Sequence, residues 1–152
     1  MRMQQTLGYF GLAPFVLALV FEKFSPALFN IAAEQVFIFY SAIIFSFIAG
    51  TLWRKNNDKL SIKLQLCSNI FSLLAFFALL LPNYLALVVL TVIYPAILCC
   101  EYYFDAAKTE HKSYLRMRLN LTTLVVIMHI IALLLWCTQP IQMYSFRYIA
   151  SE

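Results

Sequence analysis

Residues 64–103 read LQLCSNIFSLLAFFALLLPNYLALVVLTVIYPAILCCEYY, and no charged side chain precedes Glu101 in this run. A helix needs about 20 apolar residues to cross the roughly 30 Å hydrocarbon core of a bilayer. The run is long enough for two such helices. Pro82-Asn83 divides it, because proline stops a helix and this pair favours a turn. We therefore predict a tight antiparallel pair of membrane-spanning helices over residues 64–81 and 84–103.

Similar apolar segments lie on both sides of this pair, and the continuous runs lack the alternation of lipid-facing barrel strands. The first segment is short as far as Phe21, so we expect it to continue past Glu22 and Lys23 to Phe29. The predicted fold is all-α, a polytopic transmembrane helix bundle of about five spans that forms one domain over residues 1–152. The expected spans are 7–29, 35–53, 64–81, 84–103 and 115–137, followed by an interfacial tail at 138–152.

The composition supports a bilayer as the main partner of this chain. Of 152 residues, 63% are hydrophobic and 12% are charged, with a mean hydropathy of +0.81. Soluble domains carry about 45–50% apolar and about 25% charged residues, and a chain this small cannot bury such an excess. The net charge of +4 does not indicate nucleic-acid binding, because the basic residues sit in short segments between apolar runs, where they control topology and contact lipid headgroups.

Orientation follows from the distribution of lysine and arginine. With five spans, the side that holds the N-terminus carries Arg2, Arg54, Lys55, Lys59, Lys63, Lys108, Lys112, Arg116 and Arg118, whereas the other side carries Lys23 and Arg147. Because cytoplasmic connections are enriched in basic residues, we predict a cytoplasmic N-terminus and a periplasmic C-terminus. The predicted location is the bacterial inner (plasma) membrane, and the mitochondrial inner membrane is the alternative.

Polar residues flank the connection between the fourth and fifth spans. They are Glu101, Asp105, Arg116, Arg118 and Asn120. Folding the hairpin about its centre brings Asp105 toward Arg116 and Glu101 toward Asn120, and an arginine lowers the cost of a carboxylate near the membrane. Two interpretations stay open. The cluster is either an interfacial ion-pair group that fixes the hairpin, or a cytoplasm-facing pocket for a headgroup, quinone or anion.

His129 is the ionisable residue nearest the middle of a span. Such a residue is a candidate functional site by default. A neutral histidine also has a purely structural use, because it can hydrogen-bond a carbonyl or a serine or threonine on a neighbouring helix. Both interpretations stay open, although one histidine without a chain of partners makes a poor proton relay.

Small residues recur four apart in the second span, at Ala42, Ser46 and Gly50. This spacing places them on one helix face, where they allow a second helix to approach closely. The partner helix is either another span of this chain or a second protein.

No catalytic motif, metal-ligand set or phosphate-binding loop is recognisable, so we predict no enzyme activity and no cofactor. The four cysteines lie in or beside apolar runs without CxxC spacing. The leading hypothesis is an accessory or assembly factor that acts through helix–helix contacts with a larger membrane complex or with itself. The alternative is a membrane protein that binds a lipid, quinone or small anion, or a minor transporter.

Three segments carry a resemblance to a known family. They are LGYFGLAPF at 7–15, YSAIIFSFIAG at 40–50 followed by Trp53, and YLRMRL at 114–119. The chain resembles an uncharacterised family of short bacterial inner-membrane proteins that includes mitochondrial transmembrane protein 69-like proteins, over roughly residues 7–137. In that comparison Asp105 matches an acidic position and Arg116 or Arg118 a basic one, whereas Ala49 stands where a second glycine is usual. The resemblance implies a multi-span membrane protein and no particular activity.

Overall fold

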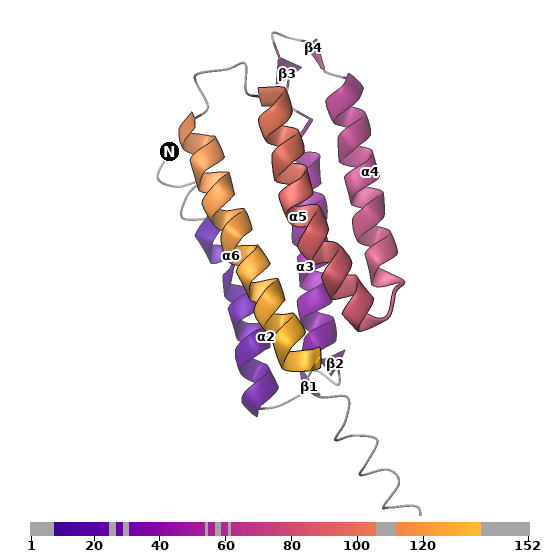
Figure 1. The fold of residues 1–152 in the computed structure, drawn as a ribbon, viewed down its shortest axis with the longest axis vertical. Helices are drawn as coiled ribbons and strands as arrows, with labels where there is room; N and C mark the ends of the chain where they lie inside the picture. The colour runs from indigo at the N-terminus through magenta and orange to yellow at the C-terminus, as the bar shows by residue number, and fades with distance from the viewer. Residues whose placement is uncertain are drawn as a thin grey trace, which may run out of the picture.

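A computed structural model describes residues 8–24, 27–28, 31–53, 55–56, 59–60, 62–105 and 112–137. Its helices are α2 (Ala13–Phe24), α3 (Ala33–Gly50), α4 (Ile62–Leu79), α5 (Asn83–Asp105) and α6 (Lys112–Cys137). Its strands are β1 (Ala27–Leu28), β2 (Ile31–Ala32), β3 (Lys55–Asn56) and β4 (Lys59–Leu60). The helices run alternately up and down along one common direction (Figure 1). The all-α bundle predicted from the sequence is therefore confirmed.

Four of these helices are long and apolar enough to cross a bilayer. Their qualifying segments are Ala33–Gly50, Ile62–Leu79, Asn83–Tyr103 and Tyr114–Trp136. The predicted boundaries of these four spans differ from the helix ends by at most three residues. Because several long apolar helices pack into one bundle, the chain is an integral membrane protein.

The first apolar segment differs from its prediction. It forms a shorter apolar helix over Gly8–Glu22, and the helical stretch ends at Phe24. The expected helical extension to Phe29 is wrong, because Ala27–Leu28 instead pairs antiparallel with Ile31–Ala32. Pro26 explains the change, since a proline disfavours the helical conformation of the residue before it.

Helix α3 lies at the centre of the bundle and contacts α2, α4 and α5. Its inward residues recur with helical spacing and are buried: Phe37, Ile38, Ser41, Ala42, Phe45 and Ala49. The buried residues of α4 are Ser68, Ala75 and Ala78. These small side chains let α3 and α4 approach closely, as is usual for helices that pack within a bilayer.

The hairpin between α4 and α5 follows the expected proline signal. The last turn of α4 tightens, with backbone hydrogen bonds from Leu80 to Phe77 and from Leu81 to Ala78. Helix α5 then starts beyond Pro82, whose carbonyl accepts the amide of Ala86 at 2.9 Å. A proline suits this position because the first helical residues have no intrahelical acceptor for their N–H groups.

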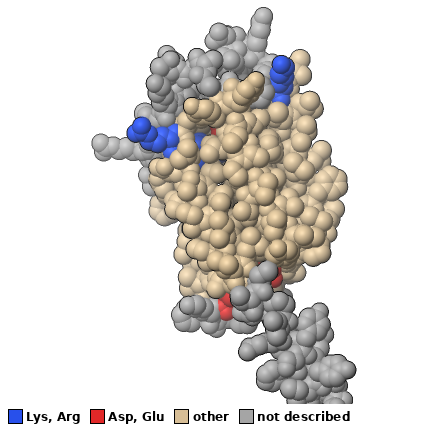
Figure 2. Space-filling model, viewed as in Figure 1, with Lys and Arg blue, Asp and Glu red and all other residues tan. Residues whose placement is uncertain are grey.

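The described charges gather at the two ends of the bundle. Lys63 lies in the first turn of α4, and Arg116 and Arg118 lie in the first turns of α6. Figure 2 shows blue basic side chains in the upper part of the molecule and red carboxylates at its lower end, with a wide belt of uncharged residues between them. The belt exposes large apolar side chains, including Ile43, Phe47 and Leu134. An uncharged apolar belt of this kind matches the hydrocarbon layer of a membrane.

Candidate functional site

Two helices contribute a buried polar stripe to the interior. On α6, the buried residues are Arg118, Thr122, Val125, His129 and Ala132. Their spacing of three or four residues places them on one helix face. On α5, the corresponding buried stripe is Leu90, Tyr94, Ile97 and Glu101. The two stripes bring an ion pair to the basic end of the bundle and a histidine to its middle.

Glu101 and Arg118 form the ion pair. Oε2 of Glu101 accepts hydrogen bonds from both Nε and Nη2 of Arg118, at 3.1 and 3.0 Å. Only 4% of the Glu101 side chain and 9% of the Arg118 side chain are exposed. Charges this deeply buried are stable only when they are paired. The pair therefore joins α5 to α6 at the end of the bundle where the described cations gather.

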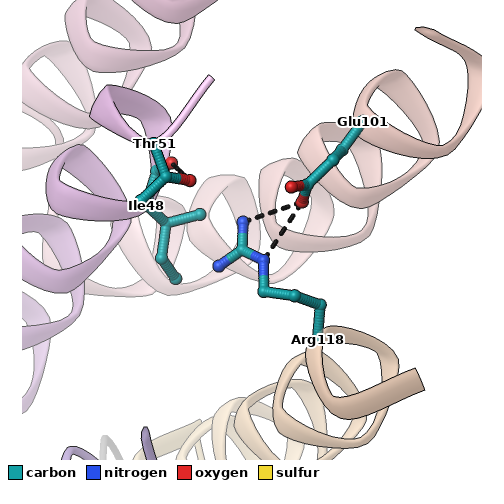
Figure 3. Close-up of polar contacts among 4 residues, drawn as sticks. All are labelled: Ile48, Thr51, Glu101 and Arg118. Carbon is teal, nitrogen blue, oxygen red and sulfur yellow. Dashed lines mark hydrogen bonds and ion pairs between the residues drawn. The ribbon is translucent and has the colours of Figure 1, made fainter. Parts of the chain in front are cut away.

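The guanidinium group of Arg118 also faces away from its partner. Figure 3 shows its third nitrogen, Nη1, pointing away from Glu101 toward the side on which Ile48 and Thr51 of α3 lie. The centroid of the Tyr114 ring lies 6.0 Å from Cζ of Arg118, within range of a cation–π contact. In the part of the chain that the structure describes, every hydrogen bond of this guanidinium goes to Glu101 through Nε and Nη2. Nη1 therefore has donor capacity to spare.

A cavity of about 440 Å³ adjoins the ion pair. Its walls come from the N-terminal helical segment and from α3, α5 and α6. Arg118, Tyr114, Thr51 and Thr122 supply the polar groups near one end, and apolar side chains such as Phe15 line most of the remainder. Its volume lies in the range of about 300–1,000 Å³ that is common for small-molecule sites, and such sites are also mostly apolar with a few polar groups.

His129 occupies a second polar site, deeper in the bundle, where it is fully buried. Its Nδ1 lies 2.8 Å from the carbonyl oxygen of Val125, and its Nε2 lies 2.8 Å from Oγ of Ser41. A carbonyl only accepts hydrogen bonds, so Nδ1 carries a proton. In the neutral ring Nε2 is then an acceptor, and the Ser41 hydroxyl donates to it. A neutral His129 thus uses both ring nitrogens.

Aromatic rings close this second site. The rings of Phe15, Phe37 and Tyr94 lie 5.9, 5.0 and 5.4 Å from the imidazole ring, centroid to centroid. The Tyr94 hydroxyl donates to the carbonyl of Ser41 at 3.0 Å. Phe15 and Tyr94 also line the cavity. Each of these two rings therefore lies beside both the cavity and His129.

The predicted polar cluster is only partly assembled. Glu101 lies against Arg118, so the expected approach of Glu101 to Asn120 is wrong; Asn120 is exposed. Helical periodicity explains this, because Asn120 follows Arg118 by two residues and so lies on nearly the opposite face of α6. Arg116 is exposed as well. The side chain of Asp105 lies outside the described residues, so its expected pairing with Arg116 stays a prediction.

The small residues of α3 do not share one environment. Ala42 is buried, Ser46 is half-buried and Gly50 is exposed. A Cβ atom added to Gly50 would meet nothing within 4 Å. The inner face of α3 passes instead through Ala49, which is fully buried. Burial thus decreases along the predicted face from Ala42 to Gly50.

The sequence does not predict several of the side-chain contacts in the structure. Ser41 and Tyr94 are the partners of His129. Both are ordinary polar residues in apolar spans, and that polarity was the one available signal. The Tyr40 hydroxyl donates to the carbonyl of Gly11 at 2.8 Å and so ties the N-terminal helical segment to α3. Such contacts between distant segments depend on how the helices are placed relative to one another.

Comparison with known proteins identifies a family. A family model described as "Protein of unknown function (DUF3429)" matches residues 1–134, which include every residue of both polar sites. Neither the curated proteins nor the solved structures contain a match. The comparison therefore supplies a family without an activity, and the chemistry must be argued from the two polar sites themselves.

Proposed function

The chain belongs to the DUF3429 family of proteins of unknown function, and from that premise we propose that it binds a lipid-soluble small molecule in the cavity beside Arg118. The observation that carries this proposal is the cavity itself, about 440 Å³ in volume and bordered by a buried ion pair. An apolar chamber with a polar end accommodates a molecule with an apolar body and a polar group. Its residues suggest binding rather than catalysis.

The test is to fill the cavity and to look for the molecule that is lost. Ile44 lines the cavity, whereas its neighbour Ile43 is 64% exposed on the lipid-facing side. We expect protein extracted from its native membrane with a polymer, without detergent, to retain roughly one apolar small molecule per chain in native mass spectrometry. Ile44→Trp should remove that molecule, and Ile43→Trp, which adds the same bulk outside, should keep it.

The controls separate loss of binding from loss of folding. Circular dichroism and thermal unfolding should show that both variants remain helical and fold cooperatively. If the molecules retained with all three proteins had the same composition as the surrounding bilayer, the proposal would be contradicted. Retention of the enriched molecule by Ile44→Trp at the same level as by Ile43→Trp would also contradict it, because the indole at position 44 competes with the ligand for space in the cavity.

A second candidate function rests on Gly50. Because this residue is exposed and has open space around it, a helix of another protein could pack there closely. In this proposal the chain is an accessory or assembly factor for a larger membrane complex or binds a second copy of itself. Gly50→Leu should then abolish co-purification of the complex in mild detergent, whereas Phe47→Leu, one turn earlier on the exposed surface of α3, should preserve it. Unchanged co-purification with Gly50→Leu would end this candidate.

We also propose a membrane location and an orientation for the chain. We place the chain in the bacterial inner membrane, or alternatively in the mitochondrial inner membrane, with the N-terminus on the cytoplasmic or equivalent side. The basic ends of α4 and α6 support this orientation through the positive-inside rule. We also propose a relationship to the transmembrane protein 69-like proteins. Reporter fusions at the two termini test the orientation, because an odd number of spans puts them on opposite sides.

A further inference from the structure

The polar end of the cavity narrows the chemistry of its ligand. Resting on the function proposed above, we propose that the ligand is a single-chain apolar molecule with a neutral carbonyl group, which accepts a hydrogen bond from Nη1 of Arg118. An ester of a fatty acid and a quinone both have this chemistry. The inference follows from three features of the site: the spare donor of Arg118, the charge of the ion pair, and the volume of the cavity.

The first feature is the spare donor. Arg118 donates two hydrogen bonds to a single oxygen of Glu101, through Nε and Nη2. Nη1 points away from Glu101 toward α3 (Figure 3). Arg118, Ile48 and Thr51 all line the cavity. Arginine has only donors, so the group it recognises must be an acceptor oxygen or nitrogen. A ligand that offers only donors would not use this site.

The second feature is charge. Among the described residues that line the cavity, Arg118 alone is charged, and the carboxylate of Glu101 already balances it. A carboxylate or phosphate ligand would add an uncompensated negative charge close to Glu101, in a region of low dielectric where such repulsion is strong. A neutral carbonyl gains the hydrogen bond without that penalty. The pair thus selects against anionic headgroups although an arginine faces the cavity.

The third feature is space. The volume of about 440 Å³ is in the lower part of the range for small-molecule sites. The apolar side chains of Phe15, Ile44 and Val125 are among those that line it. A cavity of this size and lining suits one hydrocarbon or isoprenoid chain rather than the two chains of a phospholipid. The ligand is therefore a minor apolar component of the membrane, not its bulk lipid.

Matched probes test the headgroup. The full-length protein in phosphatidylcholine nanodiscs is offered equal mole fractions of hexadecane, methyl hexadecanoate, hexadecanesulfonate or a short-tailed ubiquinone, and native mass spectrometry measures the bound fraction. We expect at least one carbonyl probe to bind about fivefold to tenfold more tightly than hexadecane, since one net hydrogen bond contributes about that factor. The sulfonate should bind no better than hexadecane. The carbonyl probe that binds more tightly identifies the source as ester or quinone.

Variants of the pair sharpen the result. Glu101→Gln keeps an oxygen acceptor for Arg118 but leaves the positive charge uncompensated, so the preference should reverse from the neutral probe to the sulfonate. Arg118→Gln should reduce the ester and the quinone to the level of hexadecane. Arg116→Gln changes an exposed arginine on the same helix and should leave all preferences as in the unaltered protein.

The outcomes separate this inference from the proposal on which it rests. If no probe binds, including hexadecane, the cavity does not hold a ligand and both fail. If hexadecane binds but the carbonyl gives no advantage, or if the unaltered protein prefers the sulfonate, the cavity is a binding site and the carbonyl inference is overturned. A preference that survives Arg118→Gln would equally overturn the assignment of Nη1.

Discussion

The two polar sites inside the bundle differ in whether their hydrogen-bonding groups are all used. Around His129, both ring nitrogens, the Ser41 hydroxyl and the Tyr94 hydroxyl each have a partner, and aromatic rings surround them. Around Arg118, one nitrogen of the guanidinium remains available beside a cavity. Both sites hold ionisable residues within apolar helices, yet only the second has capacity left for another molecule.

This difference shows how to separate structural from functional polar residues in a membrane bundle. A polar group buried in apolar surroundings costs free energy unless it is hydrogen-bonded. Where every group is paired within the chain, as at His129, the pairs are sufficient to explain why the residues are tolerated. Where a donor faces a cavity, as at Arg118, packing alone does not explain its position. The following experiments test whether the two sites differ in this way.

Removal of Arg118 should have the largest effect on stability. Arg118→Met removes the cation that pairs with the buried carboxylate of Glu101, and breaking a buried ion pair in this way costs about 3–5 kcal/mol. The free energy of unfolding, measured by denaturant titration in one detergent, should fall by that amount. The double variant Glu101→Leu/Arg118→Met should recover most of the loss, because it removes both charges. A double variant as unstable as the single one would show that the pair does not act as a unit.

Removal of His129 should have a moderate effect and should spare the cavity. His129→Leu leaves the Ser41 hydroxyl without its acceptor and the Val125 carbonyl without its side-chain donor, at a cost of about 1–3 kcal/mol. Adding Ser41→Ala should recover part of that cost, which a double-mutant cycle measures. Ligand occupancy in native mass spectrometry should stay unchanged. A loss of ligand with intact folding would show that the sealed site takes part in binding.

The helices were largely predictable from the sequence, because crossing a bilayer demands long apolar runs that stand out from their surroundings. The buried stripe of α6 could also be predicted from the sequence, because Arg118, Thr122 and His129 recur at helical spacing. Glu101 and Arg118 both belong to the polar cluster that the sequence predicts. Their pairing was not predicted, because a hairpin folded about its midpoint fixes neither the rotation of the two helices nor which side chains face inward.

The cavity and the partners of His129 depend on contacts between remote parts of the chain. Ser41 and His129 are 88 residues apart, and nothing in the local pattern of either span specifies the other. The cavity likewise forms where the N-terminal segment, α3 and α6 fail to fill the space between them. An absence of packing has no residue pattern of its own. The first helix was mispredicted for a local reason, since Pro26 outweighed the apolar residues that follow it.

Two glycines provide the finest test of the difference between the cavity side and the outer surface. A Cβ atom on Gly8 would lie 3.0 Å from Cδ1 of Leu121, and both residues line the cavity, whereas a Cβ atom on Gly50 meets nothing within 4 Å. Gly8→Ala should therefore be less favourable than Gly50→Ala by up to about 1 kcal/mol, because the Leu121 side chain has to shift to make room. Gly50→Ala should leave the protein unchanged or stabilise it by up to about 1 kcal/mol through helix propensity. The free energy of unfolding, measured side by side, should be lower for Gly8→Ala than for Gly50→Ala. Equal effects would mean that the N-terminal segment does not pack against α6 at Leu121 and does not form that wall of the cavity.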